Sequence, residues 1–97
     1  MKDAVFYILL NIKTTDGFET FGKFYIGDNR KTANQIFKKF SGNKLVNEKD
    51  VLLIELMETR EGLPLNIMTI SCTLDQLAEN CKIITKEIFK HYNLKIV

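Results

Sequence analysis

The chain is poor in the residues that punctuate or specialise small proteins. Its 97 residues include one proline, one histidine, two cysteines and no tryptophan. The low proline and glycine content excludes a collagen-like or proline-rich disordered chain. Cys72 and Cys81 are nine positions apart, a spacing that fits neither a Cys-x-x-Cys redox motif nor a zinc site. We therefore expect two reduced, buried thiols and no metal or cofactor.

Long apolar runs are also missing. The run at residues 4–12 falls well short of the roughly 18 apolar residues of a membrane span. It is closed by Asn11 and Lys13 and no small-residue cleavage site follows it, so it predicts a strand rather than a signal peptide. The net charge is only +2. We expect a soluble, cytoplasmic protein with one domain over residues 1–97 and no membrane contact.

A pattern of two apolar runs and an amphipathic helix occurs twice, over residues 5–41 and 51–92. The expected strands are residues 5–14, 18–26, 51–60 and 65–70. Asp16-Gly17 and Glu61-Gly62 predict the hairpin turns, because glycine supplies a positive φ at no steric cost. Pro64 lacks a backbone N–H, so we expect a wider second turn and a strand that begins at Leu65. The chain therefore uses a ββα unit twice.

Both expected helices have an apolar stripe at helical spacing. The first helix, over residues 29–40, follows Asp28 or Asn29 as its N-cap and stops at Gly42-Asn43. The second, over residues 74–92, follows a Thr73-x-x-Gln76 capping box, and residues 94–97 could form a short fifth strand. The stripes comprise Ala33, Ile36, Phe37 and Phe40 in the first helix and Leu74, Leu77, Ala78, Cys81, Ile84 and Ile88 in the second.

Two hairpins and two amphipathic helices bury both stripes if four strands form one antiparallel sheet with both helices on one face. We therefore predict an α+β two-layer sandwich. The alternative is a pair of separate hairpins around the helices, without a continuous sheet. The strand residues expected to face the helices are Phe6, Ile8, Leu10, Phe24, Ile26, Leu52, Ile54 and Leu56.

The opposite sheet face is the first candidate site, because its side chains are too apolar to stay in water. They are Tyr7, Leu9, Phe21, Tyr25, Val51 and Leu53. A second copy of the chain or an apolar ligand could cover this face, whereas a one-residue slip in a strand assignment would remove it. Glu55 lies on this same face, whereas Glu58 lies on the other face of the sheet. Glu55 could pair with Lys13 or Lys23, across the sheet or across a dimer axis.

Charge is the second candidate feature. Residues 29–49 carry six basic side chains and one acidic one, whereas residues 50–62 have a net charge of −3. Arg30, Lys31, Lys38 and Lys39 on the first helix could bind phosphates of a nucleic acid, or could form an ordinary solvated face. The strand-to-helix junction at residues 27–31 could hold an anion, although Asp28 would oppose it.

These features favour one function over two others. The first hypothesis is a small interaction module that homodimerises through the open sheet face, with another protein as a further possible partner. The second is a nucleic-acid or anion-binding domain that uses the basic helix. An enzyme is disfavoured, because the sequence has no nucleophile–base pair, metal cluster or cofactor loop, and His91 stands outside any acid–base grouping.

Overall fold

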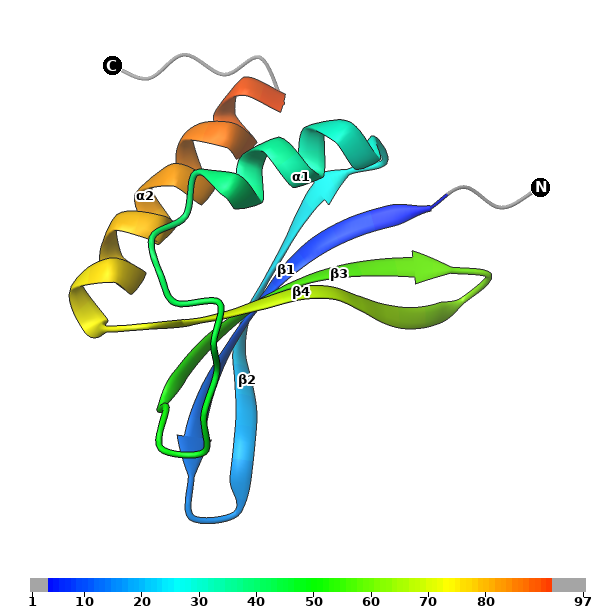
Figure 1. Ribbon diagram of the computed structural model, residues 1–97. Coiled ribbons are helices and arrows are strands. Elements are labelled where there is room, and N and C mark those ends of the chain that lie inside the picture. Colours follow the sequence, from blue (N-terminus) through cyan, green and yellow to red (C-terminus); the bar gives the residue numbers. More distant parts are fainter. Residues whose placement is uncertain (1–3, 92–97) are drawn as a thin grey trace.

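The computed structural model describes residues 4–91 and has the element order β-β-α-β-β-α (Figure 1). The strands are β1 (Val5–Thr14), β2 (Gly17–Gly27), β3 (Leu52–Arg60) and β4 (Leu63–Cys72); the helices are α1 (Arg30–Lys38) and α2 (Leu74–His91). The strands form one antiparallel sheet in the order β2-β1-β3-β4. The predicted α+β class is confirmed, and the alternative of two separate hairpins is wrong.

Both helices pack on the same face of the sheet, and the core lies between the two layers (Figure 1). All eight strand residues that alternation assigned to this face pack in that core. Ile8, Ile54 and Leu56 on the two central strands are fully buried there. None of the described helices is long and apolar enough to cross a membrane.

The order of elements repeats β-β-α, but the two halves differ in detail. Helix α1 has 9 residues, whereas α2 has 18. The duplicated ββα unit is therefore not confirmed and stays a prediction. The short strand predicted at residues 94–97 lies outside the described residues.

The second hairpin turn is as tight as the first, contrary to prediction. Glu61 and Gly62 alone connect β3 to β4, and both have positive φ, of 53° and 83°. Two positive values are typical of a type I′ turn, whose twist suits a hairpin. The next strand begins at Leu63 rather than Leu65, and Pro64 pairs with Thr59. Because β4 is an edge strand, it tolerates a residue without an N–H.

Helix α1 ends earlier than its apolar stripe predicted. Asn29 is the N-cap, with its side chain accepting a hydrogen bond from the Thr32 N–H, and the last helical residue is Lys38. The predicted stop at Gly42-Asn43 is wrong: the chain there runs against the edge of β4. A Cβ on Gly42 would lie 2.7 Å from the Ser71 carbonyl oxygen, so this close approach requires glycine.

The linker between α1 and β3 extends the sheet by one bridge. The Asn43 N–H donates to the Ser71 carbonyl at 2.8 Å, and the Ser71 N–H donates back at 2.9 Å. At the opposite edge, bulges leave Phe21 and Ile26 of β2 without a partner on β1. Both edges of the sheet are therefore interrupted, which protects a sheet against edge-to-edge pairing.

Helix α2 begins with the predicted capping box. The Thr73 N–H donates to the Gln76 side chain at 2.9 Å, and the Gln76 N–H donates to the Thr73 hydroxyl at 3.1 Å. Leu77 and Ile84 are buried as predicted, but Leu74 and Ala78 are exposed. Asn80, fully buried, occupies a core-facing position between Leu77 and Ile84.

Candidate functional site

The open face of the sheet presents side chains in three cross-strand rows. The strand register gives each row one residue from each strand, in the order β2, β1, β3 and β4. The first row is Tyr25, Tyr7, Met57 and Asn66; the second is Lys23, Leu9, Glu55 and Thr69; the third is Thr20, Asn11, Leu53 and Ser71. Because side chains alternate between faces along a strand, all three rows point away from the helices.

A seam of hydrogen bonds crosses this face diagonally. The Thr20 hydroxyl donates to Asn11 Oδ1 at 2.6 Å, and Asn11 Nδ2 donates to Glu55 Oε2 at 2.5 Å. On the other side, Asn66 Nδ2 donates to Glu55 Oε1 at 2.7 Å and lies 3.0 Å from Thr69 Oγ1. Glu55 is therefore held by two amides, and the predicted pairing with Lys13 or Lys23 within the same sheet is wrong. The Lys13 ammonium instead donates to the Glu48 carbonyl.

Sequence reasoning missed this seam because its partners lie on different strands, and their contacts depend on strand order. One signal was available. Asn11 interrupts an apolar strand, and an amide within such a strand requires a hydrogen-bonding partner. Among the described residues, every buried side-chain nitrogen and oxygen has a partner.

The six residues predicted for the open face are placed unequally. Tyr7, with 5% of its surface exposed, is buried, and Leu9 and Leu53 are half-buried. Tyr25 is 58% exposed and lies beside Tyr7, with 5.8 Å between ring centroids. Phe21 and Val51 are exposed, but Phe21 falls in the β2 bulge and Val51 precedes β3. The structure thus brings Tyr7, Leu9, Tyr25 and Leu53 together in the rows and leaves the other two at the margin.

Lys23 is the cation of the middle row. Its ammonium lies 4.7 Å from the centre of the Tyr7 ring and 5.3 Å from that of Tyr25. Such cation–π contacts are worth roughly 0.5–1 kcal/mol at an exposed site. Within residues 4–91, Lys23 has no salt bridge. The ammonium is therefore positioned by the two rings and has no carboxylate partner there.

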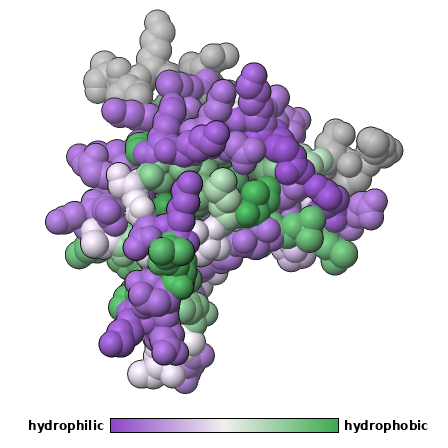
Figure 2. Space-filling view, viewed as in Figure 1, coloured by the Kyte–Doolittle hydropathy of each residue, from purple (hydrophilic) through white to green (hydrophobic). Residues whose placement is uncertain are grey.

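The basic helix is less available for phosphates than the sequence indicated. Arg30 Nη2 lies 2.8 Å from Glu58 Oε1, and Lys39 Nζ lies 2.9 Å from Glu87 Oε2. Only Lys31 and Lys38 of the four predicted cations are without an ion pair in the described part of the chain. Figure 2 shows hydrophilic residues over the two helices, as expected of a solvated helical layer.

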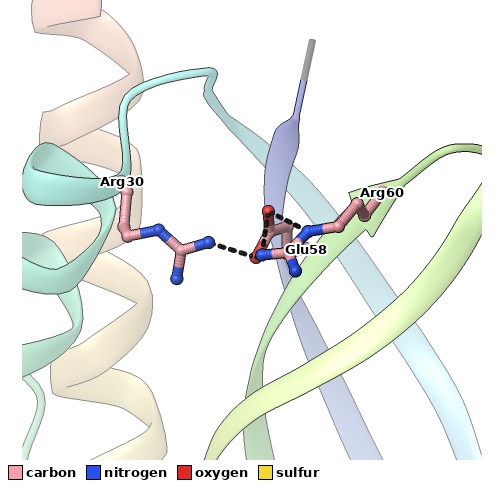
Figure 3. Close-up of polar contacts among 3 residues, drawn as sticks. All are labelled: Arg30, Glu58 and Arg60. Carbon is pink, nitrogen blue, oxygen red and sulfur yellow. Dashed lines mark hydrogen bonds and ion pairs between the residues drawn. The ribbon is translucent and has the colours of Figure 1, made fainter. Parts of the chain in front are cut away.

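A buried carboxylate explains the position of Arg30. Glu58 has a side chain only 3% exposed and lies between Arg30 and Arg60, whose side chains are 52% and 56% exposed (Figure 3). Arg30 also lies over the Phe6 ring. The anion site predicted at residues 27–31 therefore has its arginine already paired. Glu58 lies on the same face of β3 as Ile54 and Leu56, so the strand alternation in the sequence already indicated that this carboxylate is buried.

Asn80 is a second buried polar residue, on the helical side of the sheet, and it contacts Ser41 and Cys72. Asn80 accepts from the Ser41 N–H and donates to the Ser41 carbonyl, both at 2.8 Å, and its amide also lies 3.5 Å from Cys72 Sγ. Cys72 and Cys81 are free and half-buried, less buried than predicted. Burial raises the pKa of both thiols, and for Cys72 the hydrogen bond from Asn80 partly offsets this effect. A raised pKa disfavours the thiolate, which is the nucleophilic form, at neutral pH.

Comparisons with known proteins add no relative: no family model, no curated protein and no solved structure matches this chain. The residues from 4 to 91 contain no group of three or more His, Cys, Asp or Glu side chains that could hold a metal ion. The open sheet face, with its rows, seam and ammonium, is the most developed candidate site of the described structure.

Proposed function

We propose that this protein is a small cytoplasmic interaction module that forms a homodimer through the open face of its sheet. The observation that carries the proposal is the seam from Thr20 to Thr69, in which the polar groups of the face bond to one another. Apolar and aromatic side chains flank this seam: Tyr25 is exposed, and Leu9, Leu53 and Met57 are partly exposed. Two free thiols favour a reducing compartment such as the cytoplasm.

The self-contained seam lowers the cost of covering the face. An amide that loses water without gaining a partner costs about 1–3 kcal/mol. Asn11 and Asn66 already donate to Glu55, so a partner can displace water from them without leaving these donors unpaired. Leu9, Leu53 and Met57 then supply apolar surface, at about 25 cal/mol for each Å² removed from water.

The size of the face also suits a dimer. Four strands spaced about 4.8 Å apart, with roughly eight paired residues at about 3.3 Å each, present roughly 500 Å² of sheet per copy. Two copies would bury about 1,000 Å², which is near the lower bound for a specific interface. We therefore expect a dimer that dissociates at low concentration.

Light scattering coupled to size exclusion tests the proposal. At tens of micromolar, we expect a mass of twice the 11.2 kDa of one chain. Tyr25→Lys places a second cation beside Lys23 and should yield monomers. The matched control is Leu74→Lys, on the exposed start of α2, which should leave the dimer intact. A wild-type protein that stays monomeric, or a Tyr25→Lys variant that dimerises normally, contradicts the proposal.

Nucleic-acid binding through α1 is the weaker proposal, because Arg30 and Lys39 are engaged by carboxylates. Lys31 and Lys38, two helical turns apart, remain to contact phosphates. A titration of generic DNA and RNA at low salt tests it, with Lys31→Glu/Lys38→Glu as the variant. Retention that disappears in this variant and with added salt supports the proposal; no retention at low salt contradicts it.

A further inference from the structure

The rows of the open face have a symmetry that limits how two copies can pack. Strand β1 lies between β2 and β3, so each β1 residue has one neighbour on either side in its row. In the middle row Leu9 stands between a cation on β2, Lys23, and an anion on β3, Glu55. The face therefore carries opposite charges at equal distances from β1.

Consider two sheets stacked face to face about a two-fold axis that lies between them and runs along β1. A half-turn about this axis keeps each row at its level and exchanges β2 with β3. Leu9 then meets Leu9 of the second copy, and Tyr25 meets Met57 of the second copy. Lys23 meets Glu55, and because such an interface is isologous, the ion pair occurs twice.

We infer that the dimer has this arrangement, with a two-fold axis along β1 and Lys23 of each copy against Glu55 of the other. The inference rests on the proposed dimerisation and adds its register and its polar contacts. Sheets that stack in this way lie about 10 Å apart, with strands within about 30° of alignment. A lysine and a glutamate together span that gap.

The side chains of Lys23 and Glu55 are both held in position by neighbours within the same chain. The rings of Tyr7 and Tyr25 hold the Lys23 ammonium over the face. The amides of Asn11 and Asn66 fix the Glu55 carboxylate. A carboxylate has about four acceptor positions, so it can accept an ammonium in addition to these two amides.

Other two-fold axes pair the charges badly. An axis that runs across the strands through the middle row places Lys23 on Lys23 and Glu55 on Glu55, and like charges in contact cost several kcal/mol. An axis between β1 and β3 places Glu55 on Leu9, which desolvates a carboxylate without a cation. The axis along β1 is the one of these three that joins Lys23 to Glu55; it also brings the Lys13 residues of the two copies to the same level, where each ammonium already donates to the Glu48 carbonyl of its own chain.

A charge-reversal series measured by analytical ultracentrifugation tests the register. Lys23→Glu should raise the dimer Kd at least about tenfold, because the new carboxylate would meet Glu55 of the other copy. Adding Glu55→Gln, which keeps an oxygen for the seam, should restore most of the affinity. The control is Lys38→Glu, on α1 and away from the face, which should leave the Kd unchanged.

A mixing experiment gives the sharper result. Lys23→Glu and Glu55→Lys variants should each dimerise poorly alone, yet a mixture should form a heterodimer with two opposite-charge pairs, detectable when one variant carries a tag. If Glu55→Lys does not fold, the Lys23→Glu/Glu55→Gln comparison decides alone. A wild-type dimer that is insensitive to Lys23→Glu, or a loss that Glu55→Gln does not restore, overturns the register but not dimerisation. A monomeric wild type overturns dimerisation itself.

Discussion

Replacing Glu58 by glutamine should destabilise the protein markedly, although the two side chains have nearly the same shape. The carboxylate is buried between two guanidinium groups, with Arg30 at 2.8 Å and Arg60 at 3.2 Å (Figure 3). Glutamine removes the negative charge and directs an N–H₂ group towards two cations. The structure therefore predicts a loss of both ion pairs without a change in packing volume.

The magnitude follows from the burial of each partner. Removing one partner of a fully buried ion pair costs about 3–5 kcal/mol. Arg30 and Arg60 are each about half exposed and can recover hydration, so we expect a lower cost for Glu58→Gln, about 2–3 kcal/mol. For a chain of this length, that loss corresponds to a fall in Tm on the order of 10–20 °C.

Urea unfolding followed by far-ultraviolet circular dichroism measures the effect, since the chain has no tryptophan for fluorescence. All variants are compared at one protein concentration, because dimerisation would add a concentration-dependent term to stability. Glu61→Gln, in the exposed second turn, is the control and should change stability by less than about 0.5 kcal/mol. If the unfolding free energy of Glu58→Gln also lies within about 0.5 kcal/mol of the wild-type value, the reasoning is refuted.

Three further predictions concern other parts of the fold. The hydrogen bond from Lys39 lowers the pKa of Glu87 below the ordinary carboxyl value of about 4.5. The pair therefore stabilises the fold fully above that ordinary value, and the stabilisation is lost as pH falls through the lowered pKa. Over that acid range, the Tm of Glu87→Gln should fall less with decreasing pH than the Tm of the wild type. The raised pKa values of Cys72 and Cys81 predict iodoacetamide alkylation slower than that of an unfolded control at neutral pH, and equal rates would contradict the assignment. Gly42→Ala should lower Tm, because the new methyl group would press on the β4 carbonyl, and an unchanged Tm would mean that the linker adjusts freely.

The strands and their core-facing sides were predictable from sequence because the side-chain period of a strand is two, and one apolar face fixes it. Ile8 and Ile54 face the helices as expected. Helix ends were harder to predict. The stripe of α1 includes Phe40, which packs in the core although the helix ends at Lys38, so burial alone did not mark the end.

The polar interior could not be predicted in the same way. Glu58, Asn80 and Asn11 are polar residues at core-facing or sheet-facing positions, and each is satisfied by a residue distant in sequence. Glu55 illustrates the limit: its parity gave the correct face, but its partners Asn11 and Asn66 depend on the order of strands. Local pattern thus predicts which side a residue faces, and tertiary structure decides what it contacts.

The interruptions at the two sheet edges bear on how large an assembly this protein can form. Strand β4 is bridged by Asn43 at one end and carries Pro64 at the other, while β2 is broken by bulges at Phe21 and Ile26. These interruptions hinder edge-to-edge pairing of copies into one continuous sheet. One sheet face is already occupied by helices, so stacking on the other can happen once. The proposed dimer, which uses the open face of each copy, would therefore be closed at two chains and would not grow into a filament.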